Sequence, residues 1–426
     1  MTFIPRNILI FEAYTDANIG SGALVENTVK LLKAKYPGCR IRIMAHYPEA
    51  FHYEGVESVP DAYDFPYRKP RWVQVLWLSK TLLWLTLAFL QAFFLKSAPF
   101  PLFREKVRHF QWADLAVSVG AERLNDKFVS SLFFSALNLR LLKALGKRVV
   151  FFPSTVGPFL HAPTRALAAG ALRRLNLVYT RDRQSTKACL EELKLDPERV
   201  IETSDVAVCQ AQEKPEKSWA LLSSFRGRTL APDTPLVGIS ALKWTYRASK
   251  ATPFSNYPSY LQETAKLADQ LVERHGIQIA FFPTNYPVHG CREDDVEVCR
   301  EVMEKMKHPE AAFIIDRLTP PGEFKGLLSC MRVNIVTRMH ACILSTGAGI
   351  PTLSINYLFK LKEYMESLGL AEFAVDIDEF HAEALLPAFE KMWNDRDHWA
   401  GVIRKAIDGK KESLDQALQK MDLFLS

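Results

Sequence analysis

Cysteine is scarce in this sequence, and its spacing argues against two common uses. The seven cysteines are scattered and odd in number, and no two of them form a Cys-x-x-Cys pair. This pattern argues against a disulfide framework and against a cysteine-based structural zinc site, and it is typical of a reducing compartment. The seven are Cys39, Cys189, Cys209, Cys291, Cys299, Cys330 and Cys342.

Two further absences concern ligands. No cluster of histidine and acidic residues has the spacing of a metal site such as His-Glu-x-x-His, so we predict no metal. The lysine and arginine residues are spread among acidic ones without a long basic tract, although the formal net charge is +6. We therefore predict no nucleic-acid partner. An anionic small substrate or a membrane surface is enough to explain the positive excess.

The N-terminal residues do not have the pattern of a secretory signal. The apolar run at 8–11 is much shorter than the core of a signal peptide, and Glu12 and Asp16 follow it. We therefore expect a cytoplasmic protein.

One segment, at 72–95, is more apolar than the rest of the chain. Its only charged residue is Lys80, and its uncharged part is shorter than the roughly 20 residues that span a bilayer. Basic residues flank the segment, and Trp72, Trp77 and Trp84 recur along it. These features favour a helical hairpin lying on an anionic membrane, and equally a buried helix or an oligomer interface, with a transmembrane span as the third interpretation. The oligomeric state does not follow from the sequence.

The length and composition are those of a globular protein with two domains. The chain has 426 residues, of which 48% are hydrophobic and 24% charged, and single cores rarely grow to this size. Short apolar runs alternate with longer periodic ones, as in βαβ units around parallel sheets. We predict an α/β protein of two doubly wound, Rossmann-like domains facing a cleft. The predicted parts are an N-terminal, acceptor-side domain at 1–210 with an apolar helical insertion at 72–110, a connection at 211–234, a C-terminal, donor-binding domain at 235–395, and a C-terminal helix at 396–426.

The individual elements follow from the same runs. Strands are predicted near 7–11, 40–45, 115–119, 148–152 and 177–180, and then near 236–240, 278–282, 312–315, 333–336 and 352–355. Helices are predicted near 22–35, 128–145, 164–174 and 184–193, and then near 259–275, 294–306, 323–330, 339–346 and 360–368, with a long helix from about 382 that is interrupted near 394–397.

The strongest local signal for chemistry lies at the end of the predicted strand 333–336. Arg338 and His340 follow this strand directly and open the next predicted helix. They would therefore lie at the carboxyl edge of a parallel sheet, where open α/β folds bind ligands. A guanidinium at a helix start reinforces the positive end of the helix dipole and favours phosphate or carboxylate. The structural alternative is that Arg338 pairs with an acid and that His340 is a satisfied cap.

The Arg338-x-His340 element is part of a series of short motifs. The run Arg338-Met339-His340-Ala341-Cys342-Ile343-Leu344 is followed by Gly349-Ile350-Pro351 and then by Tyr357 and Lys360. Upstream stand Asn18-Ile19-Gly20, Gly157-Pro158-Phe159, Thr180-Arg181-Asp182-Arg183-Gln184-Ser185 and Ser204-Asp205. This series covers roughly 7–370 and resembles the motifs of the polysaccharide pyruvyl transferase family.

The resemblance implies a fold like that of glycosyltransferases of the B type (GT-B) and phosphoenolpyruvate as the donor substrate, with no separate cofactor. Such an enzyme moves the enolpyruvyl group onto two hydroxyls of a sugar in cell-surface polysaccharide biosynthesis and forms a pyruvate ketal. The acceptor could be lipid-linked. The match places donor binding on Arg338, His340 and Arg181, since two arginines could each hold one anion of the donor. Arg181 could instead pair locally with Asp182.

This reaction requires a group that delivers a proton to C3 of the donor. Histidine titrates nearest to neutral pH, so we expect His340 to act as general acid or to stabilise the departing phosphate. Lys360 could neutralise that phosphate, although a solvated helix residue is the commoner role.

The acceptor side gives weaker signals. Backbone amides at the first strand-to-helix turn could approach a sugar or its phosphate, although glycine there is equally explained by a tight turn. A second-domain loop resembles the family's acidic loop, and one of its three carboxylates could act as base, although most such acids cap a helix. The residues concerned are Asn18, Gly20, Ser21 and Gly22 in the turn, and Glu293, Asp294 and Asp295 in the loop.

Two other functions remain open. A nucleotide-sugar-dependent glycosyltransferase of the same fold would commonly carry a carboxylate for the ribose, yet no acidic residue occurs between Arg338 and Glu363. A non-catalytic, membrane-recruited sugar-binding scaffold would use the 72–95 segment and would not need Arg338 or His340.

Overall fold

The computed structural model resolves the chain into two compact units. Unit 1 comprises Met1–Tyr14, Thr28–Glu202 and Gln419–Ser426, and unit 2 comprises Thr15–Asn27 and Thr203–Leu418. The structure describes residues 3–61, 70, 72–73, 75–77, 79–80, 83, 101–243, 256–291 and 293–425.

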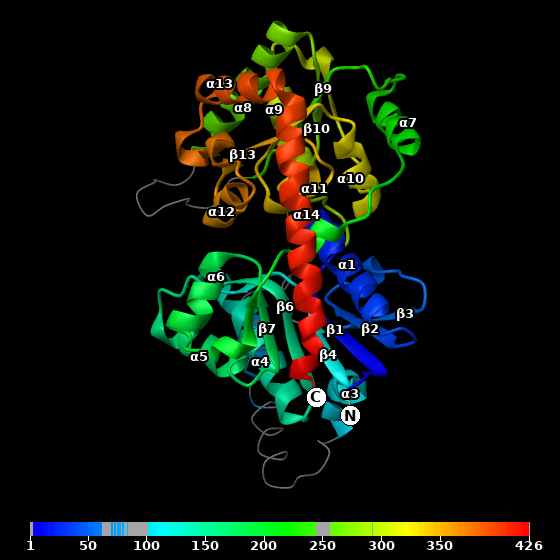
Figure 1. The fold of residues 1–426 in the computed structure, drawn as a ribbon, viewed down its shortest axis with the longest axis vertical. Coiled ribbons are helices and arrows are strands. Elements are labelled where there is room, and N and C mark those ends of the chain that lie inside the picture. The colour runs from blue at the N-terminus through cyan, green and yellow to red at the C-terminus, as the bar shows by residue number, and fades with distance from the viewer. Residues whose placement is uncertain are drawn as a thin grey trace. The chain divides into compact units, whose positions relative to one another are not determined.

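Unit 1 is built on a parallel sheet with the strand order β3-β2-β1-β4-β6-β7-β8, and the short strand β5 pairs with β6 (Figure 1). The apolar runs of the central strands are buried on both faces, as expected for a parallel sheet covered by helices. The strands are β1 (Asn7–Ala13), β2 (Arg40–Ala45), β3 (Val56–Pro60), β4 (Leu115–Ser118), β5 (Glu122–Leu124), β6 (Arg148–Val156), β7 (Leu177–Thr180) and β8 (Val200–Glu202).

Helices connect the strands of unit 1, and their apolar faces form a core with the sheet that includes Phe11, Phe110, Leu139 and Phe151. The helices that carry residues of this unit are α1 (Ile19–Lys35), whose first half belongs to unit 2, α3 (Pro101–Trp112), α4 (Val129–Ala144), α5 (Ala162–Leu172) and α6 (Arg183–Lys187).

Unit 2 repeats the architecture with the strand order β11-β10-β9-β12-β13-β14, again with parallel pairing. This is the strand order of a doubly wound dinucleotide-binding fold. The strands are β9 (Leu236–Ile239), β10 (Gln278–Phe281), β11 (Ala312–Ile314), β12 (Val333–Val336), β13 (Thr352–Asn356) and β14 (Ala374–Asp376). The helices are α7 (Pro215–Arg226), α8 (Tyr257–His275), α9 (Asp295–Met303), α10 (Pro321–Ser329), α11 (Met339–Gly347), α12 (Phe359–Ser367), α13 (Ala382–Asn394) and α14 (Arg396–Lys420).

Each sheet reverses its strand order at one place, and this place determines where a ligand is expected. In unit 1 the reversal lies between β1 and β4, and in unit 2 it lies between β9 and β12. The loops that leave the carboxyl ends of these strands diverge and leave a crevice, which is the usual ligand site of open α/β sheets.

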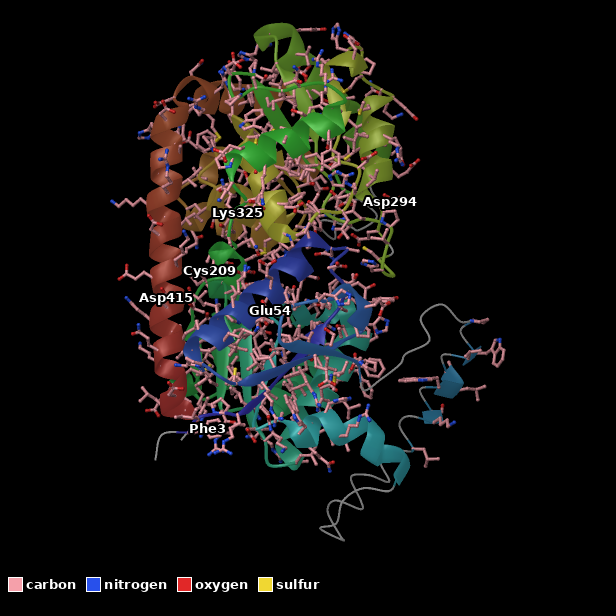
Figure 2. The ribbon with its side chains drawn as sticks, turned by 90° about the vertical axis from the view of Figure 1, so that its right-hand side faces the viewer. Phe3, Glu54, Cys209, Asp294, Lys325 and Asp415 are labelled. Carbon is pink, nitrogen blue, oxygen red and sulfur yellow. The ribbon has the colours of Figure 1, made fainter. Side chains whose placement is uncertain are left out.

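The sequence-based boundaries of the domains differ from the observed division. The predicted connection at 211–234 contains helix α7, which begins at Pro215 and ends at Gly227 in the left-handed region (φ 70°). The segment Thr15–Asn27 belongs to unit 2, because Ile19 N donates to Thr284 O and Tyr286 N donates to Ala17 O. Buried Lys325, labelled in Figure 2, also donates to Gln210 O at 2.7 Å and so holds the chain where unit 2 resumes.

Only part of the apolar segment at 72–95 lies among the described residues, and Trp84 lies outside them. The Trp77 ring packs edge-on against Phe134 of α4, with ring centroids 5.9 Å apart. Trp72, Val75, Leu76 and Leu83 are each at least 60% exposed. Within the described parts of the chain, no helix is both long and apolar enough to cross a membrane.

Candidate functional site

Arg338 and His340 lie at the reversal point of unit 2, where the sequence predicted them. Strand β12 ends at Val336, Arg338 takes the N-cap position of α11, and His340 lies in the first turn of that helix. The apolar β12 is buried between helices, so the polar residues that follow it emerge at the carboxyl edge of the sheet.

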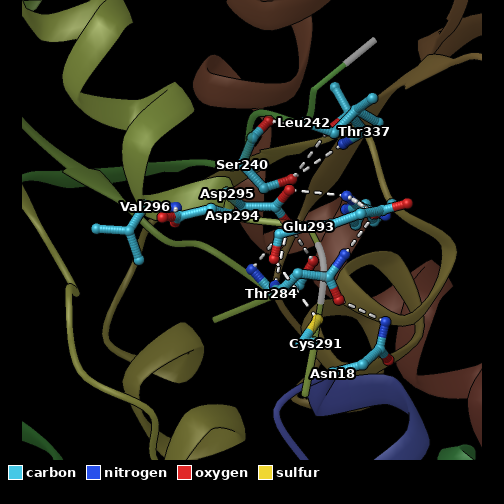
Figure 3. A network of polar contacts seen from close by, with 12 residues as sticks. Asn18, Ser240, Leu242, Thr284, Cys291, Glu293, Asp294, Asp295, Val296 and Thr337 are labelled. Atoms are coloured by element: carbon cyan, nitrogen blue, oxygen red, sulfur yellow. Dashed lines mark hydrogen bonds and ion pairs between the residues drawn. The ribbon is translucent and has the colours of Figure 1, made fainter. Parts of the chain in front are cut away.

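The Arg338 guanidinium is held by two carboxylates, Glu293 in the loop before α9 and Asp295 at the first residue of α9, both labelled in Figure 3. Its NH2 nitrogen donates to Glu293 Oε2 at 2.6 Å and to Asp295 Oδ1 at 2.7 Å. The Arg338 side chain is 14% exposed, Asp295 is fully buried, and Glu293 is 37% exposed. One positive and two negative groups therefore meet at this point, and Glu293 is the partner that water can reach.

Asp295 is fixed on several sides. Its Oδ2 accepts hydrogen bonds from the backbone N–H of Asn285 at 3.0 Å and from the hydroxyl of Thr284 at 3.1 Å. Burial raises the pKa of Asp295, and the adjacent Arg338 opposes that rise. For Arg338 itself, burial lowers the pKa, but Asp295 and Glu293 outweigh this effect and raise it well above its ordinary value. Arg338 is therefore a permanently charged, rigidly oriented group.

His340 is packed against the backbone of Gly20. A β-carbon built on Gly20 would lie 2.3 Å from His340 Nδ1, far inside van der Waals contact. On its other side, His340 Nε2 lies 3.6 Å from Asp205 Oδ2, and Asp205 accepts a hydrogen bond from Ala207 N. The His340 ring is therefore held between the backbone of Gly20 and the carboxylate of Asp205.

Two nitrogen atoms of this pair lack a hydrogen bond within the described residues. Among the residues that the structure describes, Arg338 Nε and His340 Nε2 are buried and have no hydrogen-bond partner. Buried polar atoms are nearly always satisfied, and an exception calls for a functional explanation. An anionic ligand at the edge of β12 would satisfy both atoms.

The predicted acceptor turn of Asn18, Gly20, Ser21 and Gly22 is occupied by contacts within unit 2. Asn18 Nδ2 donates to Asn285 Oδ1 at 2.5 Å, and Asn18 Oδ1 accepts from Ser21 N at 2.8 Å. A β-carbon on Gly22 would lie 3.2 Å from Pro321 Cγ. The two glycines permit close packing here, and the acceptor role of this turn stays a prediction.

Of the three candidate carboxylates, Glu293 pairs with Arg338, and Asp294 and Asp295 have different surroundings. Asp294, labelled in Figure 2, caps helix α9 by accepting from Val296 N and Glu297 N. This is the structural role that the sequence favoured for such an acid. Asp295 is the buried partner of Arg338. Both carboxylates are therefore engaged in contacts within the protein, and a role of either as base stays a prediction.

The remaining predicted donor residues, Lys360 and Arg181, belong to other elements than the one that carries Arg338 and His340. Lys360 is half-buried in the first turn of α12. Arg181 belongs to unit 1, where it is 8% exposed and its Nε donates to Thr155 Oγ1 at 2.9 Å. Thr155 in turn donates to Asp182, so these residues form one hydrogen-bonded chain at the ends of β6 and β7. A joint role for Arg181 and Arg338 stays a prediction.

Sequence reasoning named Glu293 as a candidate base but missed its pairing with Arg338, 45 positions further along the chain. It also missed the position of Asp205 beside His340. Asp205 did carry a signal, because it belongs to the Ser204-Asp205 motif.

The sequence matches a family model and a curated relative. A family model described as polysaccharide pyruvyl transferase matches residues 18–358. The amylovoran biosynthesis protein AmsJ of Erwinia amylovora is 20% identical over 415 residues, which cover 95% of this chain and 96% of that protein.

Solved structures that resemble this chain along its whole length share its fold. A glycosyltransferase from Rickettsia africae has a TM-score of 0.58 at 10% identity and full coverage of both chains (100% each). The Anabaena protein HepE in complex with UDP-glucose has a TM-score of 0.56 at 11% identity, with 98% of each chain covered. The UDP-GlcNAc 2-epimerase of Neisseria meningitidis has a TM-score of 0.57 at 10% identity, covering 96% of this chain and 99% of that one.

At such identities the likeness concerns the fold alone, and it confirms the predicted α/β class with two Rossmann-like parts. The match of the family model extends over most of the sequence and includes Asn18, Arg181, Asp205, Arg338 and His340. The chain belongs to the polysaccharide pyruvyl transferase family.

Proposed function

We propose that this protein transfers the enolpyruvyl group of phosphoenolpyruvate to two hydroxyls of a sugar and forms a pyruvate ketal. The observation that carries the proposal is a pair of buried nitrogen atoms at the reversal point of unit 2, Arg338 Nε and His340 Nε2, which have no hydrogen-bond partner among the described residues. They lie inside the region matched by the family model. A small donor with a carboxylate and a phosphate offers acceptor atoms to both.

The reaction divides into an addition across the C2–C3 double bond and a substitution of phosphate at C2. In the first, C3 of the donor takes a proton from His340 while a sugar hydroxyl oxygen bonds to C2 and gives up its proton. The C2–O bond to phosphate then breaks, and phosphate leaves with the electron pair. A second hydroxyl of the same sugar bonds to C2 and releases its proton, which leaves a methyl ketal carboxylate. His340, with Asp205 3.6 Å away, is the proton donor in this scheme.

Arg338 is proposed to orient the donor, which would displace Glu293 from the guanidinium. Asp295 stays in place because it is buried and bonded to Thr284 and Asn285. Glu293 is 37% exposed and can give way to an incoming carboxylate or phosphate. The exchange replaces one anionic partner of the guanidinium with another. Lys360 and Arg181 are proposed to hold the remaining anionic oxygens.

The acceptor is proposed to be a sugar of a cell-surface polysaccharide precursor. The relative AmsJ is described as a protein of amylovoran biosynthesis, which supports a polysaccharide product. The exposed apolar residues at Trp72, Leu76 and Leu83 support contact with a membrane surface, where lipid-linked sugars are found.

Donor binding tests the proposal and separates it from its rivals. Isothermal titration should show saturable binding of phosphoenolpyruvate to the purified protein, weakened at least tenfold in His340→Ala. A nucleotide-sugar-dependent glycosyltransferase would bind UDP-glucose and not phosphoenolpyruvate. A non-catalytic scaffold would bind neither, and either result would replace the proposal.

A further inference from the structure

Asn356 is the last residue of β13, and the nitrogen of its side-chain amide has no partner. The residue is only 4% exposed. Its Oδ1 accepts a hydrogen bond from the Ser354 hydroxyl at 2.9 Å. Its Nδ2 has no acceptor within the part of the chain that the structure describes. An amide nitrogen that is removed from water and has no acceptor destabilises the fold, so this one calls for an explanation.

The alternation of side chains along β13 places Asn356 on the side of the sheet that α11 covers. Thr352, at the start of the strand, shares a hydrogen bond with Ser345 of α11 at 2.7 Å. Residues two apart in a strand point to the same face, so Thr352, Ser354 and Asn356 share this face. The hydrogen bond between Ser354 and Asn356 agrees with this assignment. Asn356 therefore points to the same side as the helix that carries His340.

The register of the two strands brings Asn356 to the same edge of the sheet as Arg338. Strands β12 and β13 are parallel, and Val336 pairs with Ser354. Two further residues along each chain lead to Arg338 and to Asn356, and the backbone of Arg338 is still extended. The two side chains therefore follow neighbouring strands at the carboxyl edge of the unit 2 sheet.

The direction of α11 leads to the same position. The helix runs back from the carboxyl edge, because Ser345 in its last turn meets Thr352 at the start of β13. His340 lies about 7.5 Å along the helix from Ser345, and Asn356 lies about 13 Å along the strand from Thr352. The amide of Asn356 therefore reaches the start of α11, where an anion is expected.

The groups at this edge are suited to an anion. Arg338 Nε, His340 Nε2 and Asn356 Nδ2 are three buried nitrogen atoms without a hydrogen-bond partner among the described residues. Glu293 and Asp295 both accept from the NH2 nitrogen of Arg338 and leave its Nε unsatisfied. The first turns of α11 and α12, both fully described, contain no acidic side chain. The positive ends of these helices therefore add to the attraction for an anion.

We propose that Asn356 binds the donor through its side-chain amide, as a neutral third group beside Arg338 and His340. The inference rests on the proposed pyruvyl transfer and extends its donor site to β13. Asn356 Nδ2 donates a hydrogen bond to one anionic oxygen of phosphoenolpyruvate. The Ser354 hydroxyl, bonded to Oδ1, keeps the amide in the orientation that presents its NH2 group. An amide supplies a donor without adding charge, so Asn356 positions the anion that Arg338 attracts.

Two substitutions of Asn356 test the inference. Asn356→Ala removes the amide. Asn356→Asp keeps the shape of the side chain but replaces the NH2 group with an anionic oxygen that cannot donate. Ser354→Ala is a milder variant, which leaves the amide and removes the hydroxyl that orients it. The matched control is Asn394→Asp, which makes the same exchange at an exposed position at the end of α13.

The probe is phosphoenolpyruvate, titrated calorimetrically into the purified protein. We expect Asn356→Ala to raise the Kd about tenfold, which is the effect of losing one hydrogen bond to a charged group. Asn356→Asp should raise the Kd at least about 100-fold, because it places a like charge against the anionic donor. Ser354→Ala should raise it about threefold through the loss of an orienting hydrogen bond. Asn394→Asp should keep it within about twofold of the wild-type value, since solvent screens an exposed charge.

Urea unfolding of the same preparations identifies the variants that are folded. Folded Asn356→Ala and Asn356→Asp proteins that bind phosphoenolpyruvate as the wild type does would overturn the inference and leave the pyruvyl transfer standing. If Asn356→Asp does not fold, Asn356→Ala and Ser354→Ala decide the question by the same measure. A wild-type protein that does not bind phosphoenolpyruvate would instead overturn the proposed function, and this inference with it.

Discussion

The imidazole of His340 occupies the space where a β-carbon of residue 20 would lie. The distance from that β-carbon to Nδ1 would be 2.3 Å, and to Cγ it would be 2.4 Å. Glycine is required at position 20 because of this close approach and not because of its backbone freedom, since Gly20 lies inside helix α1 without a positive φ. The first turn of α1 therefore forms one wall of the His340 site.

We predict that Gly20→Ala displaces the His340 ring and reduces kcat about 100-fold, because misplacing a catalytic group by about 1 Å has an effect of this size. The crowding should also lower the free energy of unfolding by about 1–3 kcal/mol, partly offset by the better helix propensity of alanine. Steady-state phosphate release and urea unfolding measure the two effects. Gly409→Ala is the control, since nothing lies within 4 Å of its β-carbon. Equal activity of the two variants would contradict the assigned packing.

Lysine at position 338 should preserve the stability of the protein better than alanine does, but it should not restore normal donor binding. Arg338→Ala leaves Asp295 buried without its cation, so we expect a loss of about 3–5 kcal/mol of unfolding free energy. Arg338→Lys keeps the charge and should lose about 1 kcal/mol or less, while the KM for phosphoenolpyruvate rises about tenfold, because an ammonium lacks the planar fork. Unfolding curves and kinetics on the same preparations check this. A lysine variant with a normal KM would show that Arg338 is only structural.

Glu12 should make the protein less stable as the pH rises. Burial places its folded-state pKa at about 7, above the ordinary value of 4.5. The folded protein therefore holds a proton that the unfolded chain has already lost, so the contribution of Glu12 to stability is complete below pH 4.5 and disappears as the pH rises through about 7.

Glu12→Gln should accordingly be more stable than the wild type at about pH 8, by at most about 3 kcal/mol, and the difference should shrink toward about pH 4. Urea unfolding at several pH values measures it, with Glu57→Gln as the control that should track the wild type. A pH-independent difference would mean that Glu12 titrates normally.

The exposed apolar residues of the 72–95 segment should bind the protein to anionic vesicles. Trp72, Leu76 and Leu83 are 66%, 61% and 60% exposed, and burying such side chains contributes about 1.5–3 kcal/mol each. Replacing all three with serine should weaken flotation with phosphatidylserine vesicles at least tenfold. The control replaces Val129 and Leu160, which are also exposed but lie elsewhere. Equal flotation of both variants would contradict the proposed membrane contact.

Local pattern was enough to predict most of the strands and the position of Arg338 and His340. The buried run 333–336 is short and mostly apolar, and apolar residues at helical spacing follow it directly. Its carboxyl end could therefore be located from neighbouring residues alone. Helix α7 was missed within a polar stretch, although Pro215 at its start and Gly227 at its end are ordinary helix signals.

The backbone conformation of Glu12 and the pairing of Glu293 with Arg338 could not be predicted, because they depend on contacts between distant parts of the chain. The strained conformation of Glu12, with a φ of 71°, arises from the register of β1 against β2. Side chains of α4 line the cavity that holds its carboxylate. Glu293 meets Arg338 only when the loops after β10 and β12 are brought to one edge of a sheet. A single sequence carries no local mark of such pairings.

The most direct test of the central claim is the product of a reaction with carbon-labelled phosphoenolpyruvate and a lipid-linked or methyl-glycoside sugar acceptor. We predict release of inorganic phosphate and an acceptor that gains one labelled pyruvate less one water, with a ketal carbon resonance in its NMR spectrum. His340→Ala should yield neither product. A sugar nucleotide consumed in place of phosphoenolpyruvate, or phosphate released without a ketal, would contradict the proposed transfer.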